Sequence, residues 1–532
     1  MTASRTANYC RRVGVGVLLV VLADFLFYGQ PVGITVFLFG LVLAGAIVAM
    51  HPASLSLFSR NPLGKTRRAF PGKTATRFSW NCSGRIWLRP MALFAALLPL
   101  AENVSLLSVI VALAGLALFA LSLAGRLRTG IARVAGQLCL FLAVAPFQFV
   151  RDLFRWRKVS RRAGGRRFRL TVAVWLMPIS LGVVFLALFN AANPVIEQWL
   201  SRINLFVLLE RIDVLRLAFW LFVLAGTWPF LRPRLPRLLR RIMRATAPKA
   251  PRARPAAGAT EDILFGKAAI LRALLVFNGL FAVQTALDAA YLWGGLALPD
   301  GLTYAAYAHR GAYPLMVTAL LAAAFVLTAL RPGSETSRDP LIRRLVYLWV
   351  AQNIVLVVSS ILRLDLYVGA YALTYLRVAA FIWMGLVALG LALVIVRIAL
   401  EKPNAWLLSV NLLTLSATLY ACCFVNFAAL IANYNVDHSF EMNGPGTSLD
   451  IAYIRSLGPA GLPALDRLSQ HKSEIFLSYS RDITDADVET CYRAEQKNWR
   501  RWSFRDWRLL RYLDARGPLL IPQGCQPDSS PD

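Results

Sequence analysis

The stretch that decides the fold is VSLLSVIVALAGLALFALSLA, residues 104–124, which contains no charged residue. A helix that crosses the hydrocarbon core of a bilayer needs about 20 consecutive apolar residues, and this stretch is long enough. Arg126 and Arg128 follow it directly. An apolar run of this length that ends on basic residues is typical of a transmembrane helix whose end lies at the cytoplasmic face.

The same pattern recurs along the whole chain. Its 532 residues are 57% hydrophobic and only 16% charged, with a mean hydropathy of +0.55, whereas soluble domains contain about 25% charged residues. We therefore predict an all-α, polytopic transmembrane bundle with eleven spans. The predicted spans are 13–28, 32–50, 88–102, 104–124, 170–190, 213–231, 268–293, 313–330, 345–362, 376–398 and 406–432.

A twelfth apolar run, 131–150, is long enough to cross the membrane but lies between basic segments. Three arginines stand within 125–133, and 151–169 holds nine basic residues. A crossing would place one of these segments outside, whereas positive charge near spans is biased toward the cytoplasm. We predict a re-entrant or interfacial helix on the cytoplasmic side, with a full crossing as the alternative.

Charge is distributed unevenly along the chain, whose net charge is +30. The tail, 433–532, carries 12 basic and 14 acidic residues, so we place it outside, in the periplasm, with the N-terminus inside. The protein is then expected in a bacterial inner membrane. Six predicted cytoplasmic segments hold 39 of the 58 Lys and Arg and only six acids: the N-terminus, 51–89, 125–169, 232–267, 331–344 and 397–405.

The partners expected from these segments start with the lipid bilayer. The loop 232–262 is rich in Pro, Ala and Arg and is read as a flexible linker. It either fixes topology by resting on headgroups or binds anionic lipid or an acidic partner. No nucleic-acid partner is expected, because no aromatic residues alternate with the basic ones. The predicted divisions are 1–124, 125–169, 170–231, 232–262, 263–432 and 433–532.

The tail is predicted to be helical. Residues 446–470 read as two short helices broken near Gly458-Pro459, and 485–515 as one longer helix. We favour a small cap whose aromatic face forms its own core, with a membrane interface or a periplasmic protein partner as alternatives. A disulfide between Cys491 and Cys525 and two free thiols are both open. The aromatic residues of the longer helix are Trp499, Trp502, Phe504, Trp507 and Tyr512.

Motifs for catalysis are absent from the sequence. It has no phosphate-binding loop, no His-Glu-x-x-His and no Gly-x-Ser-x-Gly. Only four histidines are present, and they are scattered. We therefore expect no metal and no cofactor, and an enzyme is the least favoured reading.

Polar side chains within the spans are the remaining signal, because such groups usually face the bundle interior or a cavity. They either join helices by hydrogen bonds or line a path for a substrate or ion. On the span 268–293 they are Asn278, Gln284, Asp288 and Tyr291, and on 406–432 they are Asn411, Thr414, Thr418 and Asn426.

Charged and aromatic residues also gather at the predicted outer ends of three spans. We expect the acids to pair with the arginines, since isolated charges are costly there. The cluster either locks the outer loops or lines a pocket for an anionic or zwitterionic ligand such as a lipid headgroup. Its members are Asp288, Tyr291, Tyr304, Tyr307, His309, Arg310, Arg363, Asp365, Tyr371 and Arg377.

Several short motifs carry a family resemblance. They are DFLFYGQP at 24–31, YAAYAHRG at 304–311, YALTYLR at 371–377, ANYN at 432–435 and LDIAY at 449–453. With them the chain resembles an uncharacterised bacterial inner-membrane family, domain of unknown function 4173. The resemblance implies a multi-pass inner-membrane protein and supplies no activity, substrate or site residue.

Three classes of function remain open. The first is a transporter or lipid-handling protein with an outward-facing polar pocket. The second is a non-catalytic envelope signalling or assembly component that binds a partner through its tail. The third is an enzyme acting on a lipid-linked substrate, for which Asp288, His309 and Asp365 are the candidate residues.

Overall fold

The structure, a computed structural model, describes most of the predicted spans and of the tail. Among the residues described there is no β-strand, and seven helices are long and apolar enough to cross a membrane. The all-α, multi-pass architecture is therefore confirmed, whereas the number of spans and their orientation stay predictions. Described are 2–51, 84–127, 130–163, 213–233, 267–293, 339–444, 446–471 and 485–516, with short pieces between 175 and 185 and between 317 and 325.

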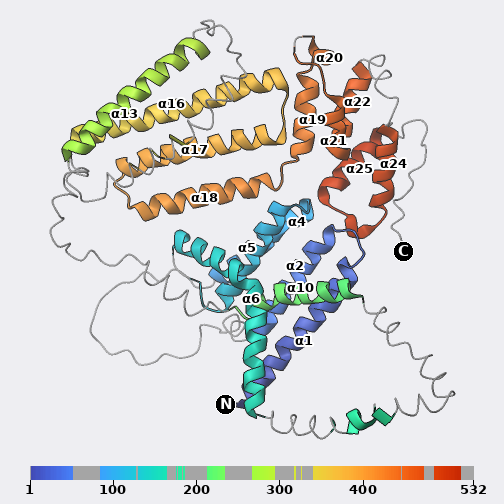
Figure 1. The fold of residues 1–532 in the computed structure, drawn as a ribbon. Coiled ribbons are helices and arrows are strands. Elements are labelled where there is room, and N and C mark those ends of the chain that lie inside the picture. The colour runs from blue at the N-terminus through green and yellow to red at the C-terminus, as the bar shows by residue number, and fades with distance from the viewer. Residues whose placement is uncertain are drawn as a thin grey trace. The chain divides into compact units, whose positions relative to one another are not determined.

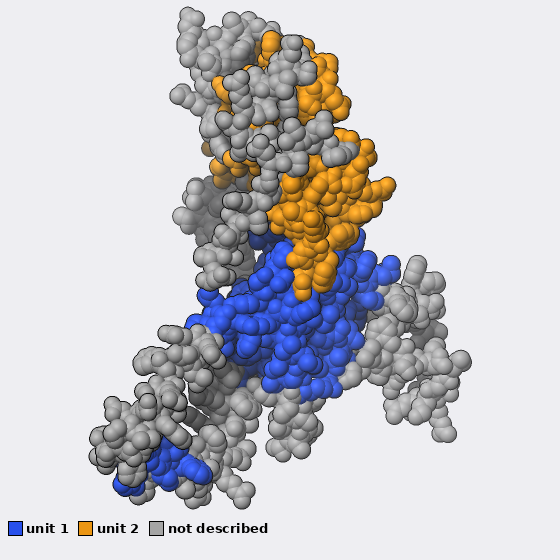
Figure 2. Space-filling view, turned by 90° about the vertical axis from the view of Figure 1, so that its right-hand side faces the viewer, with its two compact units in different colours: residues 1–128, 136–245 blue, residues 129–135, 246–532 orange. Residues whose placement is uncertain are grey.

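The chain divides into two compact units (Figure 2). The first comprises residues 1–128 and 136–245, and the second comprises 129–135 and 246–532. The boundary at 245 falls inside the stretch 232–262, which the sequence marks as a linker. Each unit is described below by itself.

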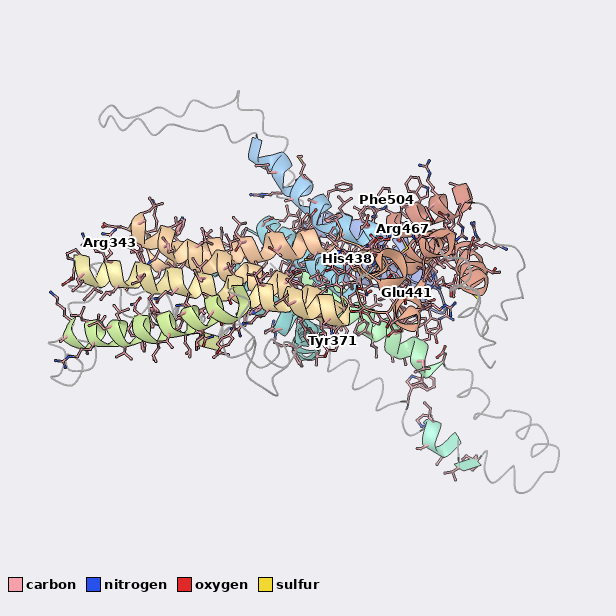
Figure 3. The ribbon with its side chains drawn as sticks, turned by 90° about the horizontal axis from the view of Figure 1, so that it is seen from above. Arg343, Tyr371, His438, Glu441, Arg467 and Phe504 are labelled. Carbon is pink, nitrogen blue, oxygen red and sulfur yellow. The ribbon has the colours of Figure 1, made fainter. Side chains whose placement is uncertain are left out.

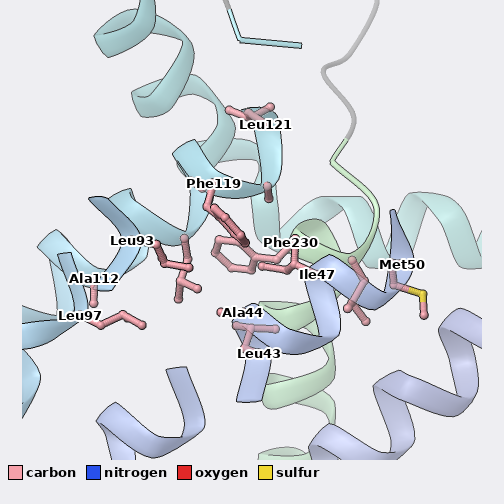
Figure 4. Close-up of a cluster of buried hydrophobic side chains, with 14 of the residues drawn as sticks. Leu43, Ala44, Ile47, Met50, Leu93, Leu97, Ala112, Phe119, Leu121 and Phe230 are labelled. Atoms are coloured by element: carbon pink, nitrogen blue, oxygen red, sulfur yellow. The ribbon is translucent and has the colours of Figure 1, made fainter. Parts of the chain in front are cut away.

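The first unit packs its helices around one apolar cluster (Figure 4). Gly29 (φ +64°) turns the chain between the first two helices, and Ser105 caps α5 in a reciprocal capping box with Ser108. Ile47 and Leu97 are completely buried in the cluster. The helices are α1 (Thr2–Phe27), α2 (Ile34–Met50), α4 (Gly84–Glu102), α5 (Leu106–Leu123), α6 (Ile131–Ala163) and α10 (Val214–Leu231).

An ion pair joins α1 to α10 in this unit. The Arg216 side chain binds both carboxylate oxygens of Asp24, with Nε 2.9 Å from Oδ1, and Trp220 Nε1 donates to Oδ1 over 2.8 Å. Tyr28 Oη donates to the Asp213 carboxylate one turn further on. The acid within the first span is therefore fully partnered, as a charge at membrane depth must be.

Helix α6 crosses the C-terminal end of α10 at a steep angle. Phe141 and Phe149 are eight residues apart, about 12 Å along a helix, yet their rings meet Phe230 and Trp228 edge-on, and these two are only two residues apart. Asp152 then pairs with Arg232 at 3.0 Å. These contacts favour a helix lying across the end of α10. The apolar part, Ile131–Asp152, is long enough to span, so the interfacial placement of 131–150 stays a prediction.

The second unit is built on a layer of four helices, visible in Figure 1 as a row in chain order. Successive helices of the row pack side by side. Helices α13 and α16 run parallel, because Lys267 pairs with Asp339 at one end and Asp288 pairs with Arg363 toward the other. The helices are α13 (Lys267–Asp288) with the π-helical turn η1 (Ala289–Trp293), α16 (Pro340–Tyr371), α17 (Tyr375–Ala399) and α18 (Asn404–Cys422).

Trp349 of α16 is the aromatic centre of this layer. Its ring stacks on Phe277 of α13, with 5.1 Å between ring centres, and meets Phe325 edge-on at 5.4 Å. Phe325 is one of the few described residues of the predicted span 313–330. The rest of that span, and most of 170–190, lie outside the described residues.

The predicted span 406–432 is wrong as a single helix. Helix α18 ends at Cys422, and a separate helix, α19 (Phe427–Asp437), begins after a short break. The side chain of Asn426 causes the break, because its Oδ1 accepts from the backbone N–H of Ala429 at 3.2 Å and so caps a new helix.

The tail folds as a set of short helices. The predicted break near Gly458-Pro459 is confirmed, whereas the single helix predicted over 485–515 is wrong. Ser503 interrupts it, since its Oγ accepts from the backbone N–H of Asp506 and starts another helix. The elements are α20 (Phe440–Asn443), α21 (Ile451–Ser456), η2 (Gly458–Gly461), α22 (Leu462–His471), α24 (Asp485–Gln496), η3 (Trp499–Arg501) and α25 (Phe504–Arg516).

The core of the tail is mainly aliphatic, with Tyr492 as a buried aromatic residue, so the prediction that the aromatic face over 499–512 forms the core is wrong. Ile454, Leu465 and Leu468 form one buried cluster, and Leu513 lies at the centre of a second. The five aromatic residues from Trp499 to Tyr512 named above are 36–51% exposed. Cys491 is disulfide-bonded, while Cys525 lies outside the described residues.

Gly115 tests the packing of the first unit. A Cβ added there would overlap the Cβ of Ala96 across the contact between α4 and α5, whereas one at Gly45 would meet nothing within 4 Å. We expect Gly115→Ala to destabilise the protein by about 1–3 kcal/mol. Gly45→Ala should leave stability equal or raised by up to about 1 kcal/mol. Thermal unfolding in detergent measures both, and equal effects would contradict this packing.

Candidate functional site

A buried ion pair joins α13 to α16. The side chains of Asp288 and Arg363 are only 2% and 3% exposed. Ser359 Oγ donates to Asp288 Oδ2 over 2.7 Å, and Gln284 Nε2 donates to Oδ1 over 3.0 Å. The expectation that Asp288 pairs with an arginine of the predicted cluster is therefore confirmed by Arg363. Because burial makes an isolated charge very costly, the pair acts as a lock between two helices.

Arg377 does not take part in that ion pair. Its guanidinium donates to the backbone carbonyls of Tyr371 and Ala372 and lies 4.6 Å from the ring centre of Tyr367. Ala372 has φ +62°, a left-handed conformation that non-glycine residues seldom adopt. Arg377 thus stabilises the C-terminal end of α16 and the strained turn that follows it.

The other predicted site residues are only partly assembled. Asp365 is exposed and has no ion-pair partner within the described part of the chain, so the pairing expected for it is not seen. Tyr291 is half-buried in η1. The four residues of the intervening loop, Tyr304, Tyr307, His309 and Arg310, lie outside the described residues.

The polar stripe on α13 faces α16. Asn278 Nδ2 donates to the Leu345 carbonyl over 3.2 Å, and Gln352 Nε2 donates to the Asn278 carbonyl over 3.3 Å. Gln284, one turn before Asp288, contributes to the ion pair. These bonds hold two helices together in the way expected of polar groups inside a membrane bundle.

The stripe on α18 lies beside an apolar groove. Asn411 and Thr414 bond to backbone carbonyls of their own helix and border a cavity of about 500 Å³ between α17 and α18. Thr418 is half-buried on the same face. Asn426 is not part of the stripe, because it caps α19.

A second cavity, of about 580 Å³, lies where the tail packs on the layer. The C-terminal end of α16, the turn before α17 and the helices α19, α20 and α21 surround it. Figure 3 labels Tyr371 and His438 at this end of the layer. Its polar and aromatic lining residues are Tyr371, Thr374, Tyr434, Asn435, His438, Asn443, Thr447, Ser448, Asp450 and Tyr453.

Two side chains hold the tail to the rim of this cavity. Asn435 clamps the turn between α16 and α17, since its Oδ1 accepts from Leu373 N–H at 2.6 Å and its Nδ2 donates to the Leu373 carbonyl at 3.0 Å. Thr447 Oγ1 donates to the Gly369 carbonyl over 3.0 Å. Gly446 (φ +139°) is required beside it, because any Cβ there would overlap the His438 carbonyl.

The lining determines what the cavity can bind. Among the described residues, no Lys or Arg lines it, and the ionisable side chains other than the tyrosines are His438 and Asp450. His438 stacks on Tyr434 with 4.0 Å between ring centres, and Asp450 caps α21. Aromatic faces with neutral hydrogen-bonding groups suit an uncharged polar head attached to an apolar body better than a strong anion. Among the described residues, no cluster that could hold a metal ion is present.

Of the lining residues, only Tyr371 is among the site residues predicted from the sequence. The stretches ANYN (432–435) and LDIAY (449–453) contribute five of the others, Tyr434, Asn435, Leu449, Asp450 and Tyr453, but in the sequence they indicate only a family resemblance. Their signal is polar and aromatic residues placed after the last apolar run.

Comparison with known proteins gives one match. Residues 88–468 match the family described as Domain of unknown function (DUF4153). The match covers more than half of the chain, so the protein belongs to this family, and the family inferred from the short motifs, 4173, is not the one it matches. Short aromatic motifs beside apolar runs do not separate one such membrane family from another. No curated protein and no solved structure matches the chain.

The ion pair makes a direct prediction about stability. Asp288→Asn leaves the buried guanidinium of Arg363 without its carboxylate, and we expect a loss of about 3–5 kcal/mol in the free energy of unfolding. The double variant Asp288→Leu/Arg363→Met should lose less, because neither charge remains. Asp365→Asn, on the exposed side of the same helix, is the control and should change stability by less than about 0.5 kcal/mol. Equal losses of unfolding free energy in Asp288→Asn and Asp365→Asn would show that the ion pair does not hold α13 and α16 together.

Proposed function

We propose that this DUF4153 member is a bacterial inner-membrane protein that handles or transports an amphiphile. The cavity of about 580 Å³ between α16, α17 and the tail is the observation that supports it. Its size is in the range of small-molecule sites, roughly 300–1,000 Å³. The bound molecule would place an uncharged polar head among the tyrosines and amides and an apolar body toward the bilayer.

The depth of the cavity supports an amphiphilic ligand. Arg343 and Arg363 are 20 residues apart on α16, which is about 30 Å along a helix and equals the thickness of the hydrocarbon core. With Arg343 at the inner boundary, the Asp288–Arg363 pair lies at the outer one. Tyr371 is two turns further along and so reaches the level of the headgroups.

The charge distribution supports an outward-facing cavity. Arg343, Arg344 and Lys402 cluster at the opposite end of the layer from the tail. Basic residues near spans favour the cytoplasm. The tail and its cavity then face the periplasm, an oxidising compartment that suits the disulfide at Cys491.

The second candidate is an envelope signalling or assembly component that binds a periplasmic protein. The tail favours it, because it folds around clusters of its own. The third candidate, an enzyme, loses support at Asp288, whose carboxylate is buried in an ion pair rather than open to a cleft.

Filling the cavity tests the proposed function. Ser448 lines the cavity, whereas Ser456, at the end of α21, is exposed and does not. We expect native mass spectrometry to find a co-purified amphiphile on the wild type and on Ser456→Trp. Ser448→Trp should retain at least tenfold less of it. Equal retention by both variants would place the molecule elsewhere, and no bound amphiphile on any of the three proteins would contradict the proposal.

Labelling of intact cells tests the topology. An introduced cysteine at Ala460, in η2, should react with an impermeant maleimide, whereas one at Ser160 should react only after lysis, because the two lie on opposite sides of the membrane. Single introduced cysteines in a background without native cysteines give the measurement. Labelling at 160 with none at 460 would reverse the whole arrangement.

A further inference from the structure

The last described helix, α25, has one face that is exposed within the described part of the chain. Its opposite side packs inward, with Leu513 fully buried and Leu509 and Leu510 beside it. The exposed face carries Phe504 and Trp507, which are 42% and 38% exposed. Arg508 and Arg511 follow on the same face and are also exposed.

Aromatic and cationic groups are layered on this face. The rings of Phe504 and Trp507 stack with 5.3 Å between centres. The guanidinium of Arg508 lies 5.0 Å from the centre of the Phe504 ring, and that of Arg511 lies 5.1 Å from Trp507. Each ring therefore holds a positive charge beside an apolar surface. Phe504 is labelled at the border of the tail in Figure 3.

One contact fixes the depth of this helix. Arg505 donates to the backbone carbonyls of Cys423 and Val425, at 3.4 and 3.2 Å. These carbonyls lie in the break directly after α18, a helix long and apolar enough to span. The N-terminal end of α25 therefore lies level with the end of a predicted membrane span.

The charge of this segment differs from that of the rest of the tail. Residues 499–516 contain six arginines and two acids, whereas the remainder of 433–532 contains six basic and twelve acidic residues. An acidic tail is repelled by an anionic membrane surface. The basic excess is confined to the segment that lies beside the span ends.

We propose that the face of Phe504, Trp507, Arg508 and Arg511 is seated in the headgroup region of the bilayer and binds anionic phospholipid. Aromatic rings are enriched at this depth, and arginines beside them reach phosphates while their stems cover apolar surface. This contact would fix the tail against the membrane. It does not depend on what the cavity binds.

Hydrogen–deuterium exchange of the full-length protein tests the proposal. The protein is placed in nanodiscs of phosphatidylcholine, alone or with phosphatidylglycerol, and peptides covering 499–516 are followed. We expect slower exchange with phosphatidylglycerol, by roughly fivefold for each arginine that meets an anionic surface. The difference should disappear in 1 M salt, where the screening length is about 3 Å.

Two double variants separate this contact from general charge effects. Arg508→Gln/Arg511→Gln should abolish the difference between the two lipids, whereas Arg467→Gln/Lys497→Gln removes the same charge elsewhere in the tail and should retain it. Peptides of α22 report whether each variant is folded. Exchange that is equal in both nanodiscs and in detergent overturns the proposal, because a protein surface, from the other unit or from a partner, would then cover the face.

Discussion

The buried pair of Asp288 and Arg363 is the interaction on which the second unit depends. Two charges that are each at least 97% buried are tolerated only when they neutralise each other. Ser359 and Gln284 add hydrogen bonds to the carboxylate. This requirement sets the register of α13 against α16 and makes the two helices parallel, so that both present the same end to the tail.

The register of α13 against α16 fixes which end of the four-helix layer meets the tail. That end determines where the tail attaches. Arg377 holds the strained turn after α16, and Asn435 clamps that turn from α19 with two hydrogen bonds to Leu373. Thr447 adds a contact with the last turn of α16. The space left between these fixed points is the cavity. The cavity therefore forms only where the tail attaches to the membrane layer. Neither the tail nor the layer contains it alone.

The sequence predicts the helices well because apolar backbone inside a bilayer has few solutions, and a helix satisfies every amide of a run such as 104–124. The sequence also predicts that Asp288 pairs with an arginine, because an isolated buried carboxylate is too costly. The break before α19 escapes prediction, because apolar residues continue on both sides and one Asn426 side chain decides it. The cavity escapes because two separate stretches of the sequence, 368–374 and 434–453, form it. The prediction that the aromatic face of α25 is buried is wrong, because amphipathicity alone does not say which face is buried.

The most direct test of the central claim is a cryo-electron microscopy map of the full-length protein in nanodiscs of native lipid. We expect an ion pair between Asp288 and Arg363 at the outer boundary of the hydrocarbon core. We also expect density for an amphiphile beside Tyr371, Tyr434 and Tyr453. A map in which α13 and α16 are joined by other contacts, with the space beside Tyr371 closed by side chains, would contradict it.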